Sequence, residues 1–458
     1  MRNRYCFLFC LFVVTALQLN AQHFYANDKP ARRWVDSVYK SLSKEERIAQ
    51  LMVVRAHSNL GKEHVEELTQ IIQKYNVGGL CFFQGGPVRE AVLTNYYQQI
   101  AKTPLMVCID GEWGLGMRLD SVVNFPRQMM LGAMQDSNIV YAFGKAVAKQ
   151  CKRLGIQVNY APVADINNNP ENPVINDRSF GENKYKVASF ATAYMRGLQD
   201  ENVMACAKHF PGHGDVAVDS HLDLPVINKT RAQLDSLELY PFRRIIKEGV
   251  ASVMNAHLYI PSIDTTANRA TSLSYNNVTG LLKNELGFKG IAVTDGLEMK
   301  GITKFYPSGD ASVQSLIAGN DMLCLPGDIE GSIQKTMIAL KKRLIKKKEF
   351  KARVKKILLA KYNLHLNHFE PIDTNHLVED INKNTADINT LIANNAITLV
   401  KQETAGILPI NAKDKVAYLA IGINAENAII KYLQSKISLD AFYFASTTDS
   451  IHTYQLID

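Results

Sequence analysis

Cysteine is scarce in this sequence, and its copies are not arranged in metal-binding or redox pairs. Seven cysteines occur in 458 residues, and none forms a Cys-x-x-Cys motif. A zinc ribbon or a dithiol redox centre is therefore not expected. The five cysteines after residue 21 are an odd number without regular spacing, which predicts no disulfide framework. Four of them lie in apolar runs, where cysteine behaves as a small core hydrophobe.

The apolar run near the N-terminus is too short to span a bilayer. It extends from Cys6 to Leu17, follows basic residues and precedes a small residue, Ala21. This three-part pattern predicts a secretory signal peptide at residues 1–21. We therefore expect a secreted, periplasmic or extracellular protein with no stable membrane insertion. A lipid anchor on Cys10 is disfavoured, because the bulky Phe9 stands where a small residue is needed.

The chain has only a modest excess of positive charge. The chain has 52 Lys and Arg against 44 Asp and Glu, and its 47% hydrophobic residues are typical of a folded globular protein. Much of the basic excess lies at residues 341–356, where Leu344, Ile345, Phe350 and Val354 recur at helical spacing. The lysines there predict the solvated face of a helix rather than a site for a membrane or an anionic polymer. We expect no nucleic-acid partner, and the oligomeric state is not predicted.

Short apolar runs alternate with amphipathic segments from about residue 44 to residue 345. The eight runs are Leu51–Val54, Gly79–Phe83, Leu105–Ile109, Gln157–Ala161, Met204–Ala207, Val253–Ala256, Ile291–Thr294 and Met322–Leu325. Their nearly continuous hydrophobicity is expected of strands that are covered on both faces. Alternating strands and helices predict parallel pairing, and eight strands favour an α/β fold of the (β/α)8 TIM-barrel type.

The pattern changes after the predicted barrel, which we place at residues 22–350. A helical linker is predicted at residues 351–390, and residues 391–458 predict the start of a second, incomplete α/β domain. The strands predicted there are Ile397–Lys401, Val416–Ile421 and Leu439–Ala445, with a helix at Glu426–Gln434.

Polar residues follow several of the predicted strands directly. They are Asp110, Asp165, Lys208-His209, Asn255 with His257, and Asp295. The C-terminal strand ends of a (β/α)8 barrel form the rim on which active sites are built. An open doubly wound sheet also places its sites there, so position alone does not separate the two folds.

The most informative segment is Lys208-His-Phe-Pro-Gly-His-Gly-Asp215, which continues to Asp219-Ser-His221. If the latter stretch is extended, residues two apart face the same way, and Asp219 can accept a hydrogen bond from His221. The second ring nitrogen is then free to exchange a proton near neutral pH, as a general acid/base. One isolated histidine would more often be structural, but this cluster beside a strand end favours a functional role.

The same segment permits a metal site as an alternative. His209, His213, Asp215 and His221 are residue types that bind transition metals. However, Pro211 and two glycines exclude the helical histidine pair of metalloproteases, and the spacing matches no familiar ligand set. We therefore favour an enzyme that uses neither a metal nor a cofactor.

Two other strand ends carry acids. Asp295 follows Ile291–Thr294 and is placed to attack an anomeric carbon, whereas Glu298 is expected to open the next helix. A structural Asp that caps a helix is the alternative for such an isolated motif. The second segment runs from Asp110 through Glu112 to Arg118 and combines acids, glycines and an arginine that suit sugar hydroxyls. Its glycine spacing does not fit a dinucleotide loop.

Taken together, these segments resemble glycoside hydrolase family 3 over about residues 43 to 345. The resemblance rests on four segments in order: Leu42-Ser-Lys-Glu-Glu-Arg-Ile-Ala-Gln-Leu, Phe125-Pro126 with Leu131-Gly-Ala, Lys208-His-Phe-Pro-Gly-His-Gly, and Thr294-Asp295. The Lys-His-Phe-Pro-Gly-His-Gly form with the later Asp-Ser-His is similar to the β-N-acetylglucosaminidase branch, the NagZ-like enzymes.

The resemblance implies that Asp295 is the nucleophile and that His221 and Asp219 form the acid/base pair. It further implies sugar contacts from Asp110, Arg118, Arg178, Lys208 and His209. Two departures stand beside these matches, because Trp113 replaces a common glycine and Gly296 replaces a commonly acidic residue. Neither removes a catalytic group.

The expected function is that of a secreted retaining exo-β-N-acetylglucosaminidase acting on peptidoglycan fragments or other carbohydrates. A β-glucosidase or an N-acetylglucosaminide phosphorylase on the same fold is an alternative. A metal-dependent hydrolase, which a chelator would inactivate, is disfavoured. A non-catalytic sugar-binding protein is disfavoured too, because all three candidate catalytic residues are present.

Overall fold

The computed structural model describes residues 22–220, 222–307, 309–401, 408–411, 413–422 and 427–444. The chain divides into two compact units, Met1–Ile397 and Thr398–Asp458. Each unit is described by itself. Among the residues that the structure describes, no helix is both long and apolar enough to cross a membrane.

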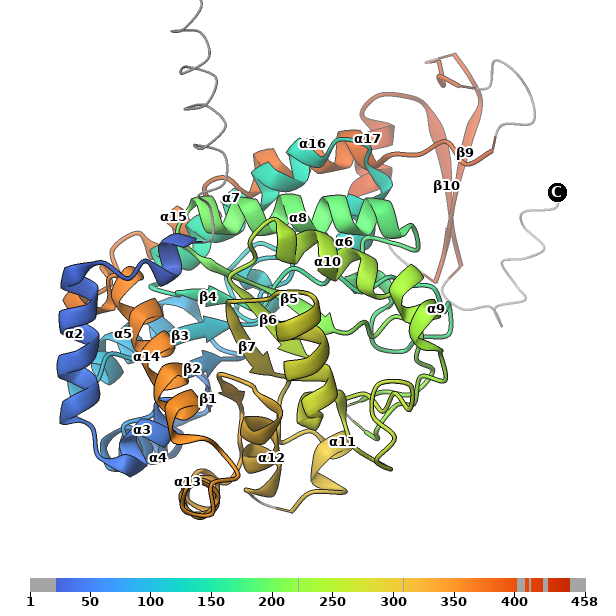
Figure 1. The fold of residues 1–458 in the computed structure, drawn as a ribbon. Coiled ribbons are helices and arrows are strands. Elements are labelled where there is room, and N and C mark those ends of the chain that lie inside the picture. Colours follow the sequence, from blue (N-terminus) through green and yellow to red (C-terminus); the bar gives the residue numbers. More distant parts are fainter. Residues whose placement is uncertain are drawn as a thin grey trace, which may run out of the picture. The chain divides into compact units, whose positions relative to one another are not determined.

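Eight parallel strands form a barrel in the first unit (Figure 1). They are β1 (Met52–Ala56), β2 (Gly79–Phe82), β3 (Met106–Ile109), β4 (Val158–Asn159), β5 (Met204–Phe210), β6 (Ser252–Asn255), β7 (Ile291–Thr294) and β8 (Leu323–Cys324). Neighbouring strands follow the chain from β1 to β7, and β8 pairs with β1. A parallel bridge between Val293 and Met322 joins β7 to the segment that enters β8 and so closes the barrel. The predicted (β/α)8 barrel is confirmed.

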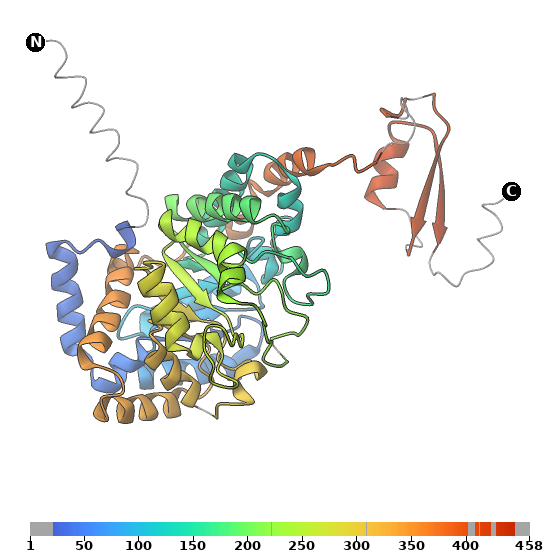
Figure 2. The same cartoon turned by 45° about the vertical axis from the view of Figure 1, so that its right-hand side comes forward.

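Helices cover the outside of this barrel (Figures 1 and 2). Those that follow the strands are α4 (Gly61–Tyr75), α5 (Pro87–Ile100), α6 (Gln128–Ala133), α7 (Ser137–Arg153), α8 (Lys184–Asp200), α9 (Arg231–Ser236), α10 (Leu239–Lys247), the π-helix η6 (Asn276–Glu285), α11 (Lys300–Thr303), α12 (Asp310–Ala318) and α13 (Ile329–Lys341). The flanking helices are α2 (Lys29–Ser41), α3 (Lys44–Ala49), α14 (Lys347–Asn363), α15 (Leu377–Asn382) and α16 (Thr385–Ala396).

Local signals explain where these helices begin. The Ser43 hydroxyl accepts a hydrogen bond from the Glu46 amide, and the Glu46 carboxylate accepts one from the Ser43 amide, so α3 starts with a capping box. The Asp136 side chain caps α7 through the Asn138 amide. Because its apolar positions recur at helical spacing, α7 buries residues such as Phe143 against the barrel.

The barrel interior contains buried thiols and a closed floor. The described cysteines are free and buried, and four lie in strands, as predicted: Cys81, Cys108, Cys206 and Cys324. At the N-terminal ends of the strands, the buried Lys361 ammonium of α14 donates to Gln50 Oε1 at 2.7 Å, and Gln50 Nε2 donates to the Asn76 carbonyl at 2.6 Å. These three residues form the floor of the barrel.

The basic stretch at residues 341–356 is only partly helical. α14 buries Phe350 and Val354 and exposes lysines, as predicted. The helical interpretation is wrong for its first residues, however, because α13 ends at Lys341 and Arg343 adopts a positive φ before α14 begins. Leu344 is consequently left 59% exposed in the turn between the two helices.

The second unit contains a parallel strand pair. β9 (Val416–Ile421) pairs with β10 (Leu439–Phe444), and α17 (Ala428–Gln434) lies between them in sequence. The strand predicted at residues 397–401 is wrong. Ile397 and Val400 are 83% and 91% exposed, and no described segment pairs with this stretch. Apolar content alone therefore misidentified a connecting segment as a strand.

Candidate active site

A cavity of about 220 Å³ opens at the C-terminal ends of the barrel strands. Six of the eight predicted site residues line it: Asp110, Arg118, Arg178, Lys208, His209 and Asp295. They come from segments that are far apart in the sequence, and the parallel strands bring them together because all strand ends of one kind meet at one rim.

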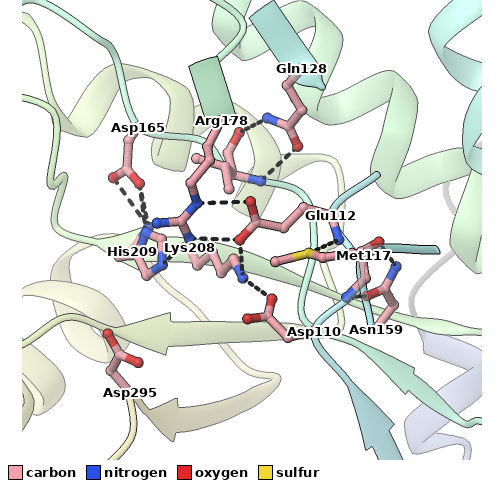
Figure 3. Close-up of polar contacts among 12 residues, drawn as sticks. Asp110, Glu112, Met117, Gln128, Asn159, Asp165, Arg178, Lys208, His209 and Asp295 are labelled. Atoms are coloured by element: carbon pink, nitrogen blue, oxygen red, sulfur yellow. Dashed lines mark hydrogen bonds and ion pairs between the residues drawn. The ribbon is translucent and has the colours of Figure 1, made fainter. Parts of the chain in front are cut away.

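An ion-pair cluster occupies one side of this cavity (Figure 3). Arg178 donates to Glu112 from Nε at 2.9 Å and from Nη2 at 2.6 Å, which is a bidentate pair. The Lys208 ammonium lies 2.6 Å from Glu112 Oε1 and also contacts Asp110. Arg118 completes the cluster by donating from Nη2 to Asp110 Oδ2 at 2.6 Å.

Mutual pairing keeps the members of this cluster charged. Burial raises the pKa of Glu112, but Arg178 and Lys208 outweigh it, so the pKa lies below its ordinary value. Burial likewise raises the pKa of Asp110, and Lys208 with Arg118 lowers it far more. Burial lowers the pKa of Lys208, whereas Asp110 and Glu112 raise it, with a net increase.

Glu112 is the member that the sequence-based prediction left out of the site. Its side chain is fully buried, whereas the side chains of Asp110, Arg118 and Arg178 are 22%, 15% and 18% exposed to solvent. Glu112 therefore positions Lys208 and Arg178, and the partly exposed groups are the ones that can exchange hydrogen bonds with sugar hydroxyls. The Asp110-Gly-Glu112 spacing was a visible signal, but it did not show which carboxylate is buried.

A buried carboxylate, Asp165, holds the loop that carries the histidines. It accepts a hydrogen bond from the His213 amide at 2.7 Å and from the His209 amide at 3.2 Å, and it lies 2.7 Å from His209 Nδ1. This contact favours a proton on Nδ1, which leaves His209 Nε2 to accept from Arg178 at 3.4 Å. Burial raises the pKa of Asp165, but His209 outweighs it and the net pKa is lowered.

His213 belongs to the same loop but is not suited to proton transfer at neutral pH. Burial lowers its pKa to about 4, so the ring is neutral at pH 7. Its Nε2 lies 3.0 Å from the Ser220 hydroxyl. Gly214 explains the tightness of this loop, because a Cβ there would lie 1.6 Å from the Ile166 carbonyl oxygen.

Asp295 lies apart from the ion-pair cluster, at the end of β7 (Figure 3). Its Oδ1 accepts a hydrogen bond from the Gly296 amide at 2.8 Å, and its own amide donates to the Asn255 carbonyl at 2.9 Å. His257 Nε2 lies 2.9 Å from the Gly296 carbonyl, which can only accept, so this nitrogen carries the proton. Strand β6 and its loop therefore fix the backbone on both sides of Asp295.

Glu298 has a different role from the one predicted. α11 begins only at Lys300, and the Glu298 carboxylate accepts from Arg55 Nε at 2.9 Å. The Arg55 guanidinium also lies 3.8 Å from the centroid of the Phe83 ring. This pair spans the junction of β1 with the loop after β7 and forms part of the cavity wall.

Comparison with known proteins assigns the chain to a family. The model of the glycosyl hydrolase family 3 N-terminal domain matches residues 43–360. The chain belongs to glycosyl hydrolase family 3. The predicted family is thereby confirmed, and this membership places the chain among the glycoside hydrolases.

Individual relatives agree with this assignment. Beta-hexosaminidase A of Pseudoalteromonas piscicida is 36% identical over 283 residues, which cover 57% of this chain and 47% of the relative. The chain thus spans about half the length of this curated relative. A solved family 3 β-N-acetylglucosaminidase from Paenibacillus sp. FPU-7 is 29% identical with a TM-score of 0.74, covering 91% of this chain and 83% of that one. These matches confirm the resemblance to the β-N-acetylglucosaminidase branch.

A third match shows the fold alone. The solved structure of a protein named beta-glucoside phosphorylase BglX has a TM-score of 0.81 and covers 92% of this chain and 78% of its own, but it is only 24% identical.

The predicted acid/base pair is only partly within the described structure. His221 lies outside the described residues. At Asp219 the extended geometry that we expected is wrong, because the amides of Leu222 and Asp223 both donate to the Asp219 carbonyl, at 2.9 and 3.0 Å. This hydrogen-bonding pattern is that of a turn that begins at Asp219.

Three residues of the alternative metal site lie within the described structure, and their side chains contact different groups. His209 and His213 are held as described above, and Asp215 accepts from Asn168 Nδ2 at 2.8 Å and lies 3.0 Å from the Lys229 ammonium. Within the described ranges, no three or more His, Cys, Asp and Glu side chains are arranged to hold a metal ion.

Proposed function

We propose that this family 3 protein is a secreted retaining exo-β-N-acetylglucosaminidase that removes terminal β-linked N-acetylglucosamine from peptidoglycan fragments or other glycans. The observation that carries the proposal is one small cavity with Asp295 on one side and a charged, hydrogen-bonding cluster on the other. A cavity of about 220 Å³ has room for about one sugar residue, which supports the removal of a terminal sugar.

The proposed reaction has two steps. The Asp295 carboxylate attacks C1 of the sugar while His221, paired with Asp219, protonates the departing glycosidic oxygen. A covalent glycosyl-enzyme forms at Asp295. Water then gives its proton to the same histidine and attacks C1, which releases the sugar with its configuration retained.

The cluster would bind the sugar in this reaction. Asp110 can accept hydrogen bonds from hydroxyl groups, and Arg118 and Arg178 can donate them. Because the charges are already paired and fixed, little reorganisation is needed when a substrate enters. Asp165 holds His209 and the loop backbone in position for the same purpose.

The choice of N-acetylglucosamine and the cellular location rest on other observations. The names of the relatives support the N-acetylhexosamine, and the basic, apolar and small residues of the first 21 positions support secretion. A substrate outside the cytoplasm makes cell-wall fragments the proposed glycan.

Phosphorolysis is a second candidate for the same site. A histidine in place of a carboxylic acid leaves less negative charge where the second nucleophile enters, so phosphate could replace water. The yields of free sugar and of sugar 1-phosphate, measured with and without phosphate, distinguish the two reactions. Sugar 1-phosphate as the main product would replace the hydrolase by a phosphorylase.

The proposal is tested by turnover of an aryl β-N-acetylglucosaminide. Asp295→Asn is expected to lower kcat by roughly three orders of magnitude or more, because an amide is a poor nucleophile. Asp177→Asn is the matched control, since this carboxylate is exposed and bound to Arg127 at 2.7 and 2.8 Å. Equal rates for wild type and Asp295→Asn would contradict the assignment, and preference for an aryl β-glucoside would indicate a glucosidase.

A further inference from the structure

Two basic segments that are distant in the sequence lie side by side on the barrel. Helix α2 packs along α14 in both views (Figures 1 and 2). Lys355 of α14 is ion-paired with Asp36 of α2. The ammonium groups of Lys351 and Lys355 lie 5.6 and 5.7 Å from the centroid of the Tyr39 ring. We call the exposed surface of residues 29–47 and 337–356 the basic face.

The two segments that form the basic face carry more positive charge than the whole chain, although the side chains of Arg353 and Lys356 are only 11% and 27% exposed. The two segments contain sixteen Lys and Arg and four Asp and Glu, a net charge of +12, whereas the chain as a whole has +8. The remaining residues therefore carry a net charge of −4. Many of these cations are exposed, including Arg32, Arg33, Lys342, Lys347 and Lys348. The concentration on one surface creates a positive field that attracts anions.

Apolar groups lie among these cations. A groove of about 480 Å³ is lined by apolar side chains of Tyr39, Ile338, Leu340 and Phe350 and is bordered by Lys44, Arg47, Lys341 and Lys347. Ile338 is 52% exposed, and Leu344, in the turn after α13, is 59% exposed. A surface that combines lysines with exposed aliphatic groups is typical of proteins that bind at a lipid interface.

The basic face lies toward the end of the barrel opposite the active-site rim. Helix α3, which carries Lys44 and Arg47, leads into the start of β1. Helix α13 returns from the rim after β8, so its C-terminal residues Ile338–Lys341 lie toward the start of the strands. Binding through this face would leave the cavity open to a glycan.

Contrary to the expectation from the sequence that the lysines of residues 341–356 form only a solvated helix face, we propose that the basic face binds a membrane surface rich in anionic phospholipid. The lysines and arginines would contact lipid phosphates, and Ile338 and Leu344 would enter the headgroup layer. A hydrated anionic polymer would use the charges alone, whereas the groove and the exposed aliphatic groups favour lipid. This inference does not depend on the proposed enzymatic activity.

Vesicle flotation tests the charge requirement. The chain beginning at Gln22 is mixed with vesicles of phosphatidylcholine alone or with about one third phosphatidylglycerol, at about 0.1 M salt. Lys342→Gln, Lys347→Gln and Lys348→Gln are combined in one variant. Each basic group near an anionic surface contributes roughly fivefold to partitioning, so a loss on the order of a hundredfold is expected. A control variant combines Lys149→Gln, Lys247→Gln and Lys383→Gln, which are exposed lysines of other segments, and is expected to bind as wild type does.

A second variant distinguishes binding to a lipid surface from binding to an anionic polymer. Ile338→Ser with Leu344→Ser is expected to weaken vesicle binding several-fold and to leave binding to inorganic polyphosphate unchanged. Three results would each overturn the proposal. They are failure to bind the anionic vesicles, equal binding by the two triple-lysine variants, and vesicle binding that is insensitive to the Ile338 and Leu344 changes.

Discussion

Each end of the barrel buries a lysine, but the pKa values of the two lysines are shifted in opposite directions. At the rim, Lys208 contacts the carboxylates of Asp110 and Glu112, and its pKa is raised. At the floor, Lys361 donates to the neutral Gln50 side chain, and burial lowers its pKa to about 7. Burial alone therefore does not decide whether a lysine is charged. The rim maintains its charges by pairing them, which is what the binding of a polar sugar requires.

The largest effect is expected from breaking the pairing at the rim. Lys208→Met leaves Asp110 and Glu112 without their shared cation, so we expect a loss of roughly 3–5 kcal/mol in unfolding free energy. We also expect kcat/KM to fall by at least about a thousandfold, because the carboxylates are repositioned or protonated. Denaturant unfolding and turnover of the aryl substrate measure the two effects. Lys361→Met is the matched change at the floor, and comparable losses of activity in both variants would remove the distinction between the two ends.

Asp165→Asn tests whether the loop must be held by a full carboxylate. An amide offers one acceptor oxygen where the His209 amide, the His213 amide and His209 Nδ1 now share two. We expect kcat/KM to fall on the order of a hundredfold through misplacement of the loop. Normal activity with an unchanged pH profile in Asp165→Asn would argue against this positioning role, whereas partial restoration of the rate by Asp165→Glu would support it.

The buried Lys361 at the floor is expected to make the stability of the protein depend on pH in an unusual way. Because the folded-state pKa of Lys361 is about 7 and the unfolded-state pKa is near its ordinary value, the unfolded state binds the extra proton between these values. This lysine therefore destabilises the fold at neutral pH, and the cost declines as the pH rises above 7. Lys361→Met should be more stable than wild type at pH 7, with an advantage smaller by roughly 2 kcal/mol at pH 9. A constant difference at both pH values, measured by denaturant unfolding, would contradict the assignment.

The smallest effect is expected at the half-exposed pair between Arg55 and Glu298. Both side chains keep 36% of their exposure, so the pair contributes less than about 1 kcal/mol to stability. Glu298→Gln should retain kcat within about threefold, in contrast to Asp295→Asn three positions earlier. A loss as large as that of Asp295→Asn would move the nucleophile assignment to Glu298.

The sequence was sufficient to predict the barrel. The barrel strands are buried on both faces, so each appears in the sequence as a nearly continuous hydrophobic run. Ile291–Thr294 was located to the residue, and the rim positions followed from it. The same signal failed at residues 397–401 and at Leu344, because an exposed apolar residue looks like a buried one in sequence. Tertiary contacts decide such cases.

The site was predicted less completely than the fold. Six predicted residues line one cavity, but Glu112 and Asp165 were not recognised as the groups that hold the others. Sixty-six positions separate Glu112 from Arg178, and only the closed barrel shows that they form a buried pair. Residue type and strand-end position indicate which groups reach the rim, whereas their mutual contacts depend on the packing of distant loops.

The most direct test of the central claim is to trap the sugar on the enzyme. A fluorinated N-acetylglucosaminyl fluoride, whose glycosyl-enzyme breaks down slowly, is incubated with wild type and with Asp295→Asn, and the digested proteins are analysed by mass spectrometry. We predict one added sugar on the wild-type peptide that contains Asp295 and none on the variant. Turnover without any covalent adduct, or an adduct on a different residue, would contradict the account.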